Sequence, residues 1–140
     1  MEGSAFMSKM KNEDIHHNLN WESKLILVAE DVDTSNMFFA AALRKTKAKV
    51  LWAKTGTEAV ELARKHPEID VVLMDIHMPG LNGFEATREI KKINRDISII
   101  IQTAYTLSGE KEKGYEAGAD GFITKPIKYL ELIKTIKQHI

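Results

Sequence analysis

Five short apolar runs, each followed by a segment with helical periodicity, constrain the fold of this chain more than any other feature. The runs occupy residues 25–29, 50–53, 71–74, 97–101 and 121–124. They are mostly continuous rather than alternating, which is typical of strands that are buried on both faces of a parallel sheet. The sequence therefore predicts five parallel strands rather than an antiparallel sheet with one solvated face.

Amphipathic segments separate these runs, at residues 34–45, 57–66, 84–93, 110–117 and 129–139. In the second segment Ala59, Val60 and Ala63 share one face, while Glu61 and Arg64 lie on the other. The order predicts an α/β fold of (βα)5 type, with three layers because right-handed crossovers place helices on both faces of the sheet. We expect Asp33 or Thr34 to cap the first helix.

Composition narrows the class of protein further. The chain has 140 residues, no cysteine and a formal net charge of zero, so it is predicted to be one domain without disulfides or a nucleic-acid-binding face. No apolar run approaches the ~20 residues of a membrane span, so we expect a cytoplasmic protein without membrane contact. Residues 1–23 are predicted to be a flexible tail or linker, and 1–7 could derive from a vector. Trp21 is either the first docked residue or a linker aromatic.

Polar residues of particular types follow four of the predicted strands. Glu30 and Asp31 follow the first strand, Asp75 the third, Thr103 the fourth and Lys125 the fifth. In open parallel sheets, ligands bind beyond the carboxyl ends of the strands. We therefore expect these five side chains to share one pocket.

The charges in this predicted pocket indicate its chemistry. Two carboxylates ~4 Å apart in a partly buried site repel each other by roughly 4 kcal/mol. Three carboxylates therefore call for a cation, and oxygen ligands suit Mg²⁺ (or Mn²⁺). The lysine and the hydroxyl add partners for phosphoryl oxygens, which indicates a carboxylate nucleophile that forms an aspartyl phosphate.

Four motifs identify a family. ILVAED at 26–31, LMDIHMPG at 73–80, QTA at 102–104 and GFITKP at 121–126 together resemble the receiver (CheY-like) domain of two-component response regulators. The stretch NGFEATR at 82–88 is most like the receivers of hybrid sensor histidine kinases. The resemblance covers residues 24–140. It implies a flavodoxin-like fold with strand order 2-1-3-4-5. It also implies phosphorelay signal transduction by a domain that accepts a phosphoryl group and is not itself an enzyme, although the chain could be part of a hybrid kinase.

The resemblance also assigns the metal and acceptor residues. Asp75 matches the phosphoacceptor. Asp31 and Asp75 match residues that hold Mg²⁺ directly, and Glu30 matches one that acts through water. His77 matches a position whose backbone carbonyl completes the metal shell.

The remaining matched positions concern the phosphoryl group and the response to it. Thr103 and Lys125 match its hydroxyl and ammonium partners, and Ala104 leaves room for the donor. Phe122 matches the aromatic switch, although a static core aromatic is a second interpretation. Lys125–Pro126 is a position where the family often has a cis peptide. The resemblance implies a sensor histidine kinase or histidine phosphotransfer domain as donor. A downstream protein would bind the face formed by 110–117, 121–124 and 129–139.

Two other classes of function remain as alternatives. One is a pseudo-receiver that docks partners without phosphorylation, for which a missing acid or lysine would be typical; none is missing. The other is an enzyme on a similar sheet. A haloacid-dehalogenase-type phosphatase places a second Asp where this chain has His77, and a nucleotide enzyme needs a glycine-rich loop where it has Glu30 and Asp31. The cognate kinase, the oligomeric state and the phosphoryl lifetime stay open.

Overall fold

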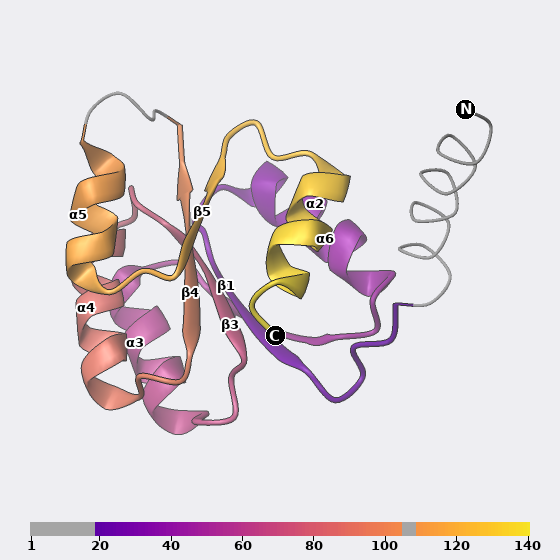
Figure 1. Ribbon diagram of the computed structural model, residues 1–140, viewed down its shortest axis with the longest axis horizontal. Coiled ribbons are helices and arrows are strands. Elements are labelled where there is room, and N and C mark those ends of the chain that lie inside the picture. The colour runs from indigo at the N-terminus through magenta and orange to yellow at the C-terminus, as the bar shows by residue number, and fades with distance from the viewer. Residues whose placement is uncertain (1–18, 105–108) are drawn as a thin grey trace, which may run out of the picture.

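Five parallel strands form one sheet in the order β2-β1-β3-β4-β5 (Figure 1). The computed structural model describes residues 19–104 and 109–140. The strands are β1 (Leu25–Ala29), β2 (Lys49–Ala53), β3 (Val71–Asp75), β4 (Ser98–Thr103) and β5 (Gly121–Thr124). This order confirms the predicted flavodoxin-like fold, and it places β1 and β3 side by side at the centre of the sheet.

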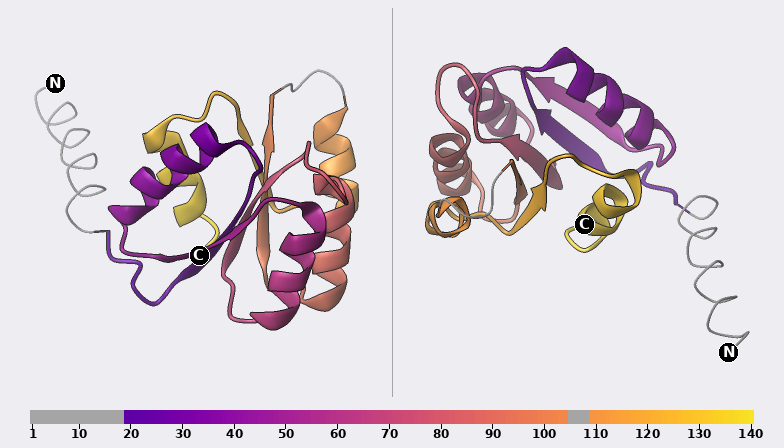
Figure 2. Two further views of the ribbon diagram at one scale, coloured as in Figure 1. Left: turned by 180° about the vertical axis from the view of Figure 1, so that it is seen from behind. Right: turned by 90° about the horizontal axis from the view of Figure 1, so that it is seen from above.

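Helices cover both faces of the sheet and complete the three predicted layers. They are α2 (Asp33–Arg44), α3 (Gly56–Lys65), α4 (Gly83–Ile93), α5 (Glu110–Ala117) and α6 (Tyr129–Lys137). Helices α3, α4 and α5 lie on one face, and α2 and α6 lie on the other (Figures 1 and 2). None of the helices in the described part of the chain combines the length and the apolar character that crossing a membrane requires.

The central strands bury side chains on both faces, which explains their continuous apolar runs. Leu27 and Val72 pack toward α3 and α4, while Ile26 and Leu73 pack toward α2 and α6. All four side chains have no exposed surface. The sheet is therefore held between two apolar cores, and both cores fix the strand ends from which the site is built.

Trp21 packs against the domain, which decides the question that the sequence left open. Its side chain is 7% exposed and lies in the core under α2 and α6. Its backbone N–H donates to the carbonyl of Thr46 at 2.7 Å. Leu19 is buried beside it, so residues 19–21 of the predicted tail belong to the packed structure. Residues 1–18 of that tail lie outside the described residues.

The start of α2 differs from the expectation. Neither Asp33 nor Thr34 caps the helix; its N-cap is Val32, and no side chain accepts a hydrogen bond there. The carboxylate of Glu30 instead accepts the backbone N–H groups of Asp31 at 3.0 Å and Val32 at 3.3 Å. The turn between β1 and α2 is thus stabilised by a residue of the predicted pocket, which leaves Asp33 to face solvent.

Candidate functional site

Three carboxylates meet at the carboxyl edge of the sheet. Glu30 and Asp31 follow β1, and Asp75 is the last residue of β3. One oxygen from each lies within 4.8 Å of the other two. Glu30 has no exposed surface and Asp75 is 4% exposed, while Asp31 is the least buried of the three. The arrangement offers hard oxygen ligands of the kind that Mg²⁺ and Mn²⁺ prefer.

Lys125 joins this group from the end of β5. Its Nζ lies 3.0 Å from Oδ1 of Asp75 and 3.4 Å from Oε1 of Glu30. The backbone N–H of Lys125 donates to the carbonyl of Thr103 at 2.8 Å, which fixes the end of β5 against β4. The Lys125–Pro126 peptide bond is cis. One ammonium therefore contacts two of the three acids.

The electrostatics of the pocket favour an added cation. Burial raises the pKa of Glu30 above its usual 4.5, and the charge of Asp75 raises it further. Burial acts to lower the pKa of Lys125, but the hydrogen bond and charge of Asp75, followed by those of Glu30, raise it overall. A single ammonium cannot balance three carboxylates, so a divalent cation would relieve the repulsion that remains.

The backbone at Asp75 is held by a close contact that the sequence analysis missed. A Cβ added at Gly83, the first residue of α4, would lie 2.3 Å from the carbonyl oxygen of Asp75. The N–H of Gly83 donates to the carbonyl of Ile76 at 2.8 Å. Only glycine allows α4 to begin this close to the end of β3. The Asn-Gly pair at 82–83 was the available signal, since Asn82 caps this helix.

Thr103 lies at the same edge but is engaged elsewhere. It ends β4, is 1% exposed, and its Oγ1 donates to Oε2 of Glu110 at 2.5 Å. No motif in the sequence indicated Glu110 as a partner of this hydroxyl. Ala104 and His77, the two flanking positions that the resemblance assigned, are exposed.

Phe122 packs under α5 rather than in the pocket. Its ring centroid lies 4.8 Å from that of Tyr115 in an edge-to-face arrangement. A Cβ at Gly114 would come within 2.5 Å of the Phe122 ring, so this glycine creates the space that the ring fills. Glycine inside a helix costs about 1 kcal/mol relative to Ala. The close approach of α5 to β5 explains why a glycine occupies this position despite that cost.

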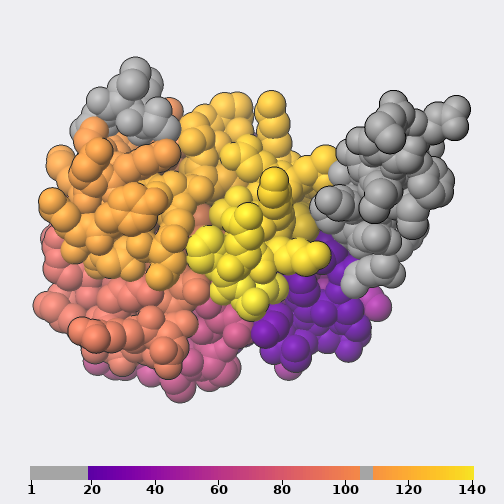
Figure 3. All heavy atoms as spheres, viewed as in Figure 1, coloured from indigo at the N-terminus to yellow at the C-terminus, as the bar shows by residue number. Residues whose placement is uncertain are grey.

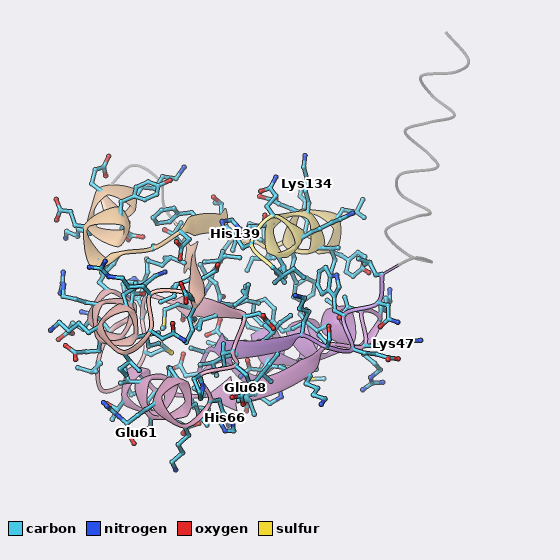
Figure 4. The ribbon with its side chains drawn as sticks, turned by 60° about the horizontal axis from the view of Figure 1, so that its bottom comes forward. Lys47, Glu61, His66, Glu68, Lys134 and His139 are labelled. Atoms are coloured by element: carbon cyan, nitrogen blue, oxygen red, sulfur yellow. The ribbon has the colours of Figure 1, made fainter. Side chains whose placement is uncertain are left out.

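The other histidines of the described residues make contacts away from this edge. His66 and Glu68 lie together at the end of α3, with Nδ1 3.0 Å from Oε1 (Figure 4). The ring of His139 lies between the backbone carbonyls of Thr135 and Asp120. Neither histidine contributes to the carboxylate group.

Comparison with known proteins gives consistent matches along the whole domain. The family model described as the response regulator receiver domain matches residues 26–137. Protein PilH of Pseudomonas aeruginosa is 42% identical over 113 residues, which span 79% of this chain and 93% of PilH. The residues that the family model matches include every residue of the site described above.

Two solved structures are similar in fold and sequence. One is the receiver domain of the sensor histidine kinase PA1611 from Pseudomonas aeruginosa, which has a magnesium ion in its active-site cleft. It matches this chain with a TM-score of 0.77 and 33% identity, and the match covers 83% of this chain and 96% of the PA1611 receiver chain. One chain of the co-crystal structure of the Saccharomyces cerevisiae histidine phosphotransfer signaling protein Ypd1 with the receiver domain of its downstream response regulator Ssk1 has a TM-score of 0.77 and 26% identity. That match covers 83% of this chain and 88% of the other.

Proposed function

The chain belongs to the response regulator receiver family, and we propose that it accepts a phosphoryl group from a phosphohistidine donor onto Asp75 in a Mg²⁺-dependent reaction. The observation that carries this proposal is the contact of Lys125 with Asp75 beside a group of three carboxylates. Incubation with acetyl phosphate and Mg²⁺ tests it. Intact mass spectrometry should find one phosphoryl group per chain, and none when a chelator replaces Mg²⁺.

The metal ligands we propose are the carboxylates of Asp31 and Asp75 and the backbone carbonyl of His77, with Glu30 acting through water. The carboxylate oxygens are close enough to share one ion. The magnesium in the cleft of the PA1611 receiver supports this choice of metal. When bound, Mg²⁺ (or Mn²⁺) supplies positive charge that offsets the charge of the transferred phosphoryl group.

In the transfer step, a carboxylate oxygen of Asp75 forms a bond to phosphorus while the phosphorus–nitrogen bond of the donor breaks. The bonding electron pair stays on the donor imidazole. Lys125 already lies 3.0 Å from Asp75 and can follow the incoming phosphoryl oxygens, where its charge stabilises the transition state. The small side chain of Ala104, exposed at the end of β4, leaves space for the donor.

The donor we propose is the phosphohistidine of a sensor histidine kinase or of a histidine phosphotransfer domain. The similarity to a chain in the Ypd1–Ssk1 complex supports a donor of this kind. The similarity to the PA1611 receiver supports a relationship to the receivers of sensor kinases. The compartment we propose is the cytoplasm, in keeping with the match to the response regulator receiver family.

Replacing Glu30 with Gln should stabilise the metal-free protein at neutral pH and weaken Mg²⁺ binding about 10- to 100-fold. The raised pKa of Glu30 means that the folded state disfavours the ionised carboxyl. The protonated carboxyl therefore contributes its full stability below the pKa of Glu30 in the unfolded chain, and this stability is lost as the pH rises through the higher pKa of Glu30 in the folded chain. The variant should lack this loss. Urea unfolding in chelator, from weakly acidic to neutral pH, measures the first effect, and calorimetric titration measures the second.

Two outcomes would count against this account of Glu30. One is a metal-free variant that is less stable than the parent chain at neutral pH. The other is unchanged affinity for Mg²⁺. Glu61→Gln, an exposed change on α3 with the same loss of charge, is the matched control and should alter neither quantity.

The response we propose is a change on the face formed by α5, β5 and α6, which would bind a downstream protein. Figure 3 shows this face, with α5 and α6 on either side of the segment that contains β5. Phosphorylation should shift the amide NMR signals of these three elements, because Thr103 and Phe122 connect them to the pocket. Shifts confined to the residues around Asp75 would contradict a switch on this face.

A further inference from the structure

The hydroxyl of Thr103 is held by the first residue of α5. Its Oγ1 donates to Oε2 of Glu110 at 2.5 Å, although no pattern in the sequence links the two residues. A threonine hydroxyl carries one proton, so it can donate to one acceptor at a time. While Glu110 accepts this proton, a phosphoryl oxygen on Asp75 cannot.

The same contact ties the start of α5 to the sheet. The N-cap of α5 is Gly109, which has a left-handed φ of 75° and provides no side-chain cap. The side chain of Glu110 extends from the first turn of α5 to the end of β4, where it accepts the hydrogen bond from Thr103. Strand β4 pairs with β3 so that Asp75 lies opposite Gln102, the neighbour of Thr103. Asp75 and Thr103 thus end adjacent strands, and the hydroxyl of Thr103 contacts the first residue of α5.

We propose that Glu110 is a positioning residue for the phosphorylation switch, which holds the Thr103 hydroxyl in the unphosphorylated protein and releases it when Asp75 carries a phosphoryl group. This inference rests on the function proposed above. A phosphoryl group adds about −1.5 to −2 charges and strong acceptor oxygens, so it competes for the hydroxyl and repels the Glu110 carboxylate. The proton stays on Thr103 and only its acceptor changes. Loss of the contact frees the first turn of α5, and α5 belongs to the face of α5, β5 and α6 that we propose as the binding surface for a downstream protein.

The test compares the affinity for beryllofluoride, a phosphoryl mimic, in the presence of Mg²⁺. Glu110→Ala removes the competing acceptor and should tighten binding about tenfold, because hydrogen bonds to charged groups are the stronger ones. Glu110→Gln keeps a neutral acceptor and should have an intermediate affinity. Glu112→Gln removes the same charge from the same helical turn, at an exposed residue, and should bind like the parent chain.

Repeating the Glu110→Ala substitution in a Thr103→Val chain distinguishes loss of the Thr103–Glu110 hydrogen bond from a general effect of the substitution on α5. In a Thr103→Val chain, which has no hydroxyl to compete for, Glu110→Ala should change beryllofluoride affinity by less than about twofold. Equal tightening in both backgrounds, or a Glu110 series that matches Glu112→Gln, would overturn the inference while leaving the proposed function intact. A parent chain that binds no beryllofluoride and takes no label from acetyl phosphate would instead overturn the proposed function. Urea unfolding of each variant verifies that it is folded.

Discussion

Asp75→Asn should reduce phosphoryl labelling by acetyl phosphate to the limit of detection. The carboxylate of Asp75 is the nucleophile, and an amide oxygen at the same position is too weakly nucleophilic to replace it. The substitution changes the shape of the side chain little, so the hydrogen bond from the N–H of Ile76, 3.0 Å from Oδ1, can persist. The variant also loses one charge from a crowded acidic pocket, so we expect it to fold.

Asp33→Asn is the matched control for this experiment. Asp33 lies close to the same edge, at the start of α2, but its carboxylate faces solvent and contacts Lys54 at 3.3 Å. Because it lies outside the carboxylate group, its loss should leave labelling unchanged. Labelling that survives Asp75→Asn would show that another residue is the acceptor, and labelling that disappears in both variants would indicate a general charge effect.

Trp21→Ala should lower the free energy of unfolding by about 3–5 kcal/mol. The side chain is 7% exposed and fills part of the core between α2 and α6, so its removal exposes apolar surface and leaves a cavity. Domains of this size are stable by only about 5–15 kcal/mol, so the loss would be a large fraction of the total. Urea unfolding monitored by circular dichroism measures it.

The second tryptophan provides the control. Trp52 lies on the edge strand β2 and is 38% exposed, so Trp52→Ala removes the same side chain from a site with more solvent. We expect it to cost clearly less than Trp21→Ala. Equal losses in the two variants would contradict the packing of residues 19–21 as part of the domain.

The fold could be predicted because its signal is local and repeated. Each central strand is apolar on both faces, and this pattern together with intervening amphipathic segments permits few arrangements other than a parallel sheet between helices. The pocket could be predicted for a related reason. Glu30, Asp75 and Lys125 each follow an apolar run directly, and parallel strands bring their carboxyl ends to one edge.

Other features depend on individual tertiary contacts or on which nearby side chain accepts a free backbone N–H, and the hydrophobic and helical patterns of the sequence encode neither. Trp21 is a single aromatic without periodicity, and its docking depends on Thr46 and on the core beyond it. The cap of α2 was predicted from residue preference, but Glu30 took the free N–H groups of that turn. The hydrogen bond from Thr103 to Glu110 joins the end of β4 to the first residue of α5, and neither the strand pattern nor the helix pattern indicates it.

A crystal structure of the chain with Mg²⁺ and beryllofluoride tests the central claim most directly. We expect a metal ion bound by Asp31, Asp75 and the backbone carbonyl of His77, with beryllofluoride on Asp75 in contact with Lys125 and Thr103. A pocket that stays empty at saturating concentrations of both, or beryllofluoride attached to a different side chain, would contradict it.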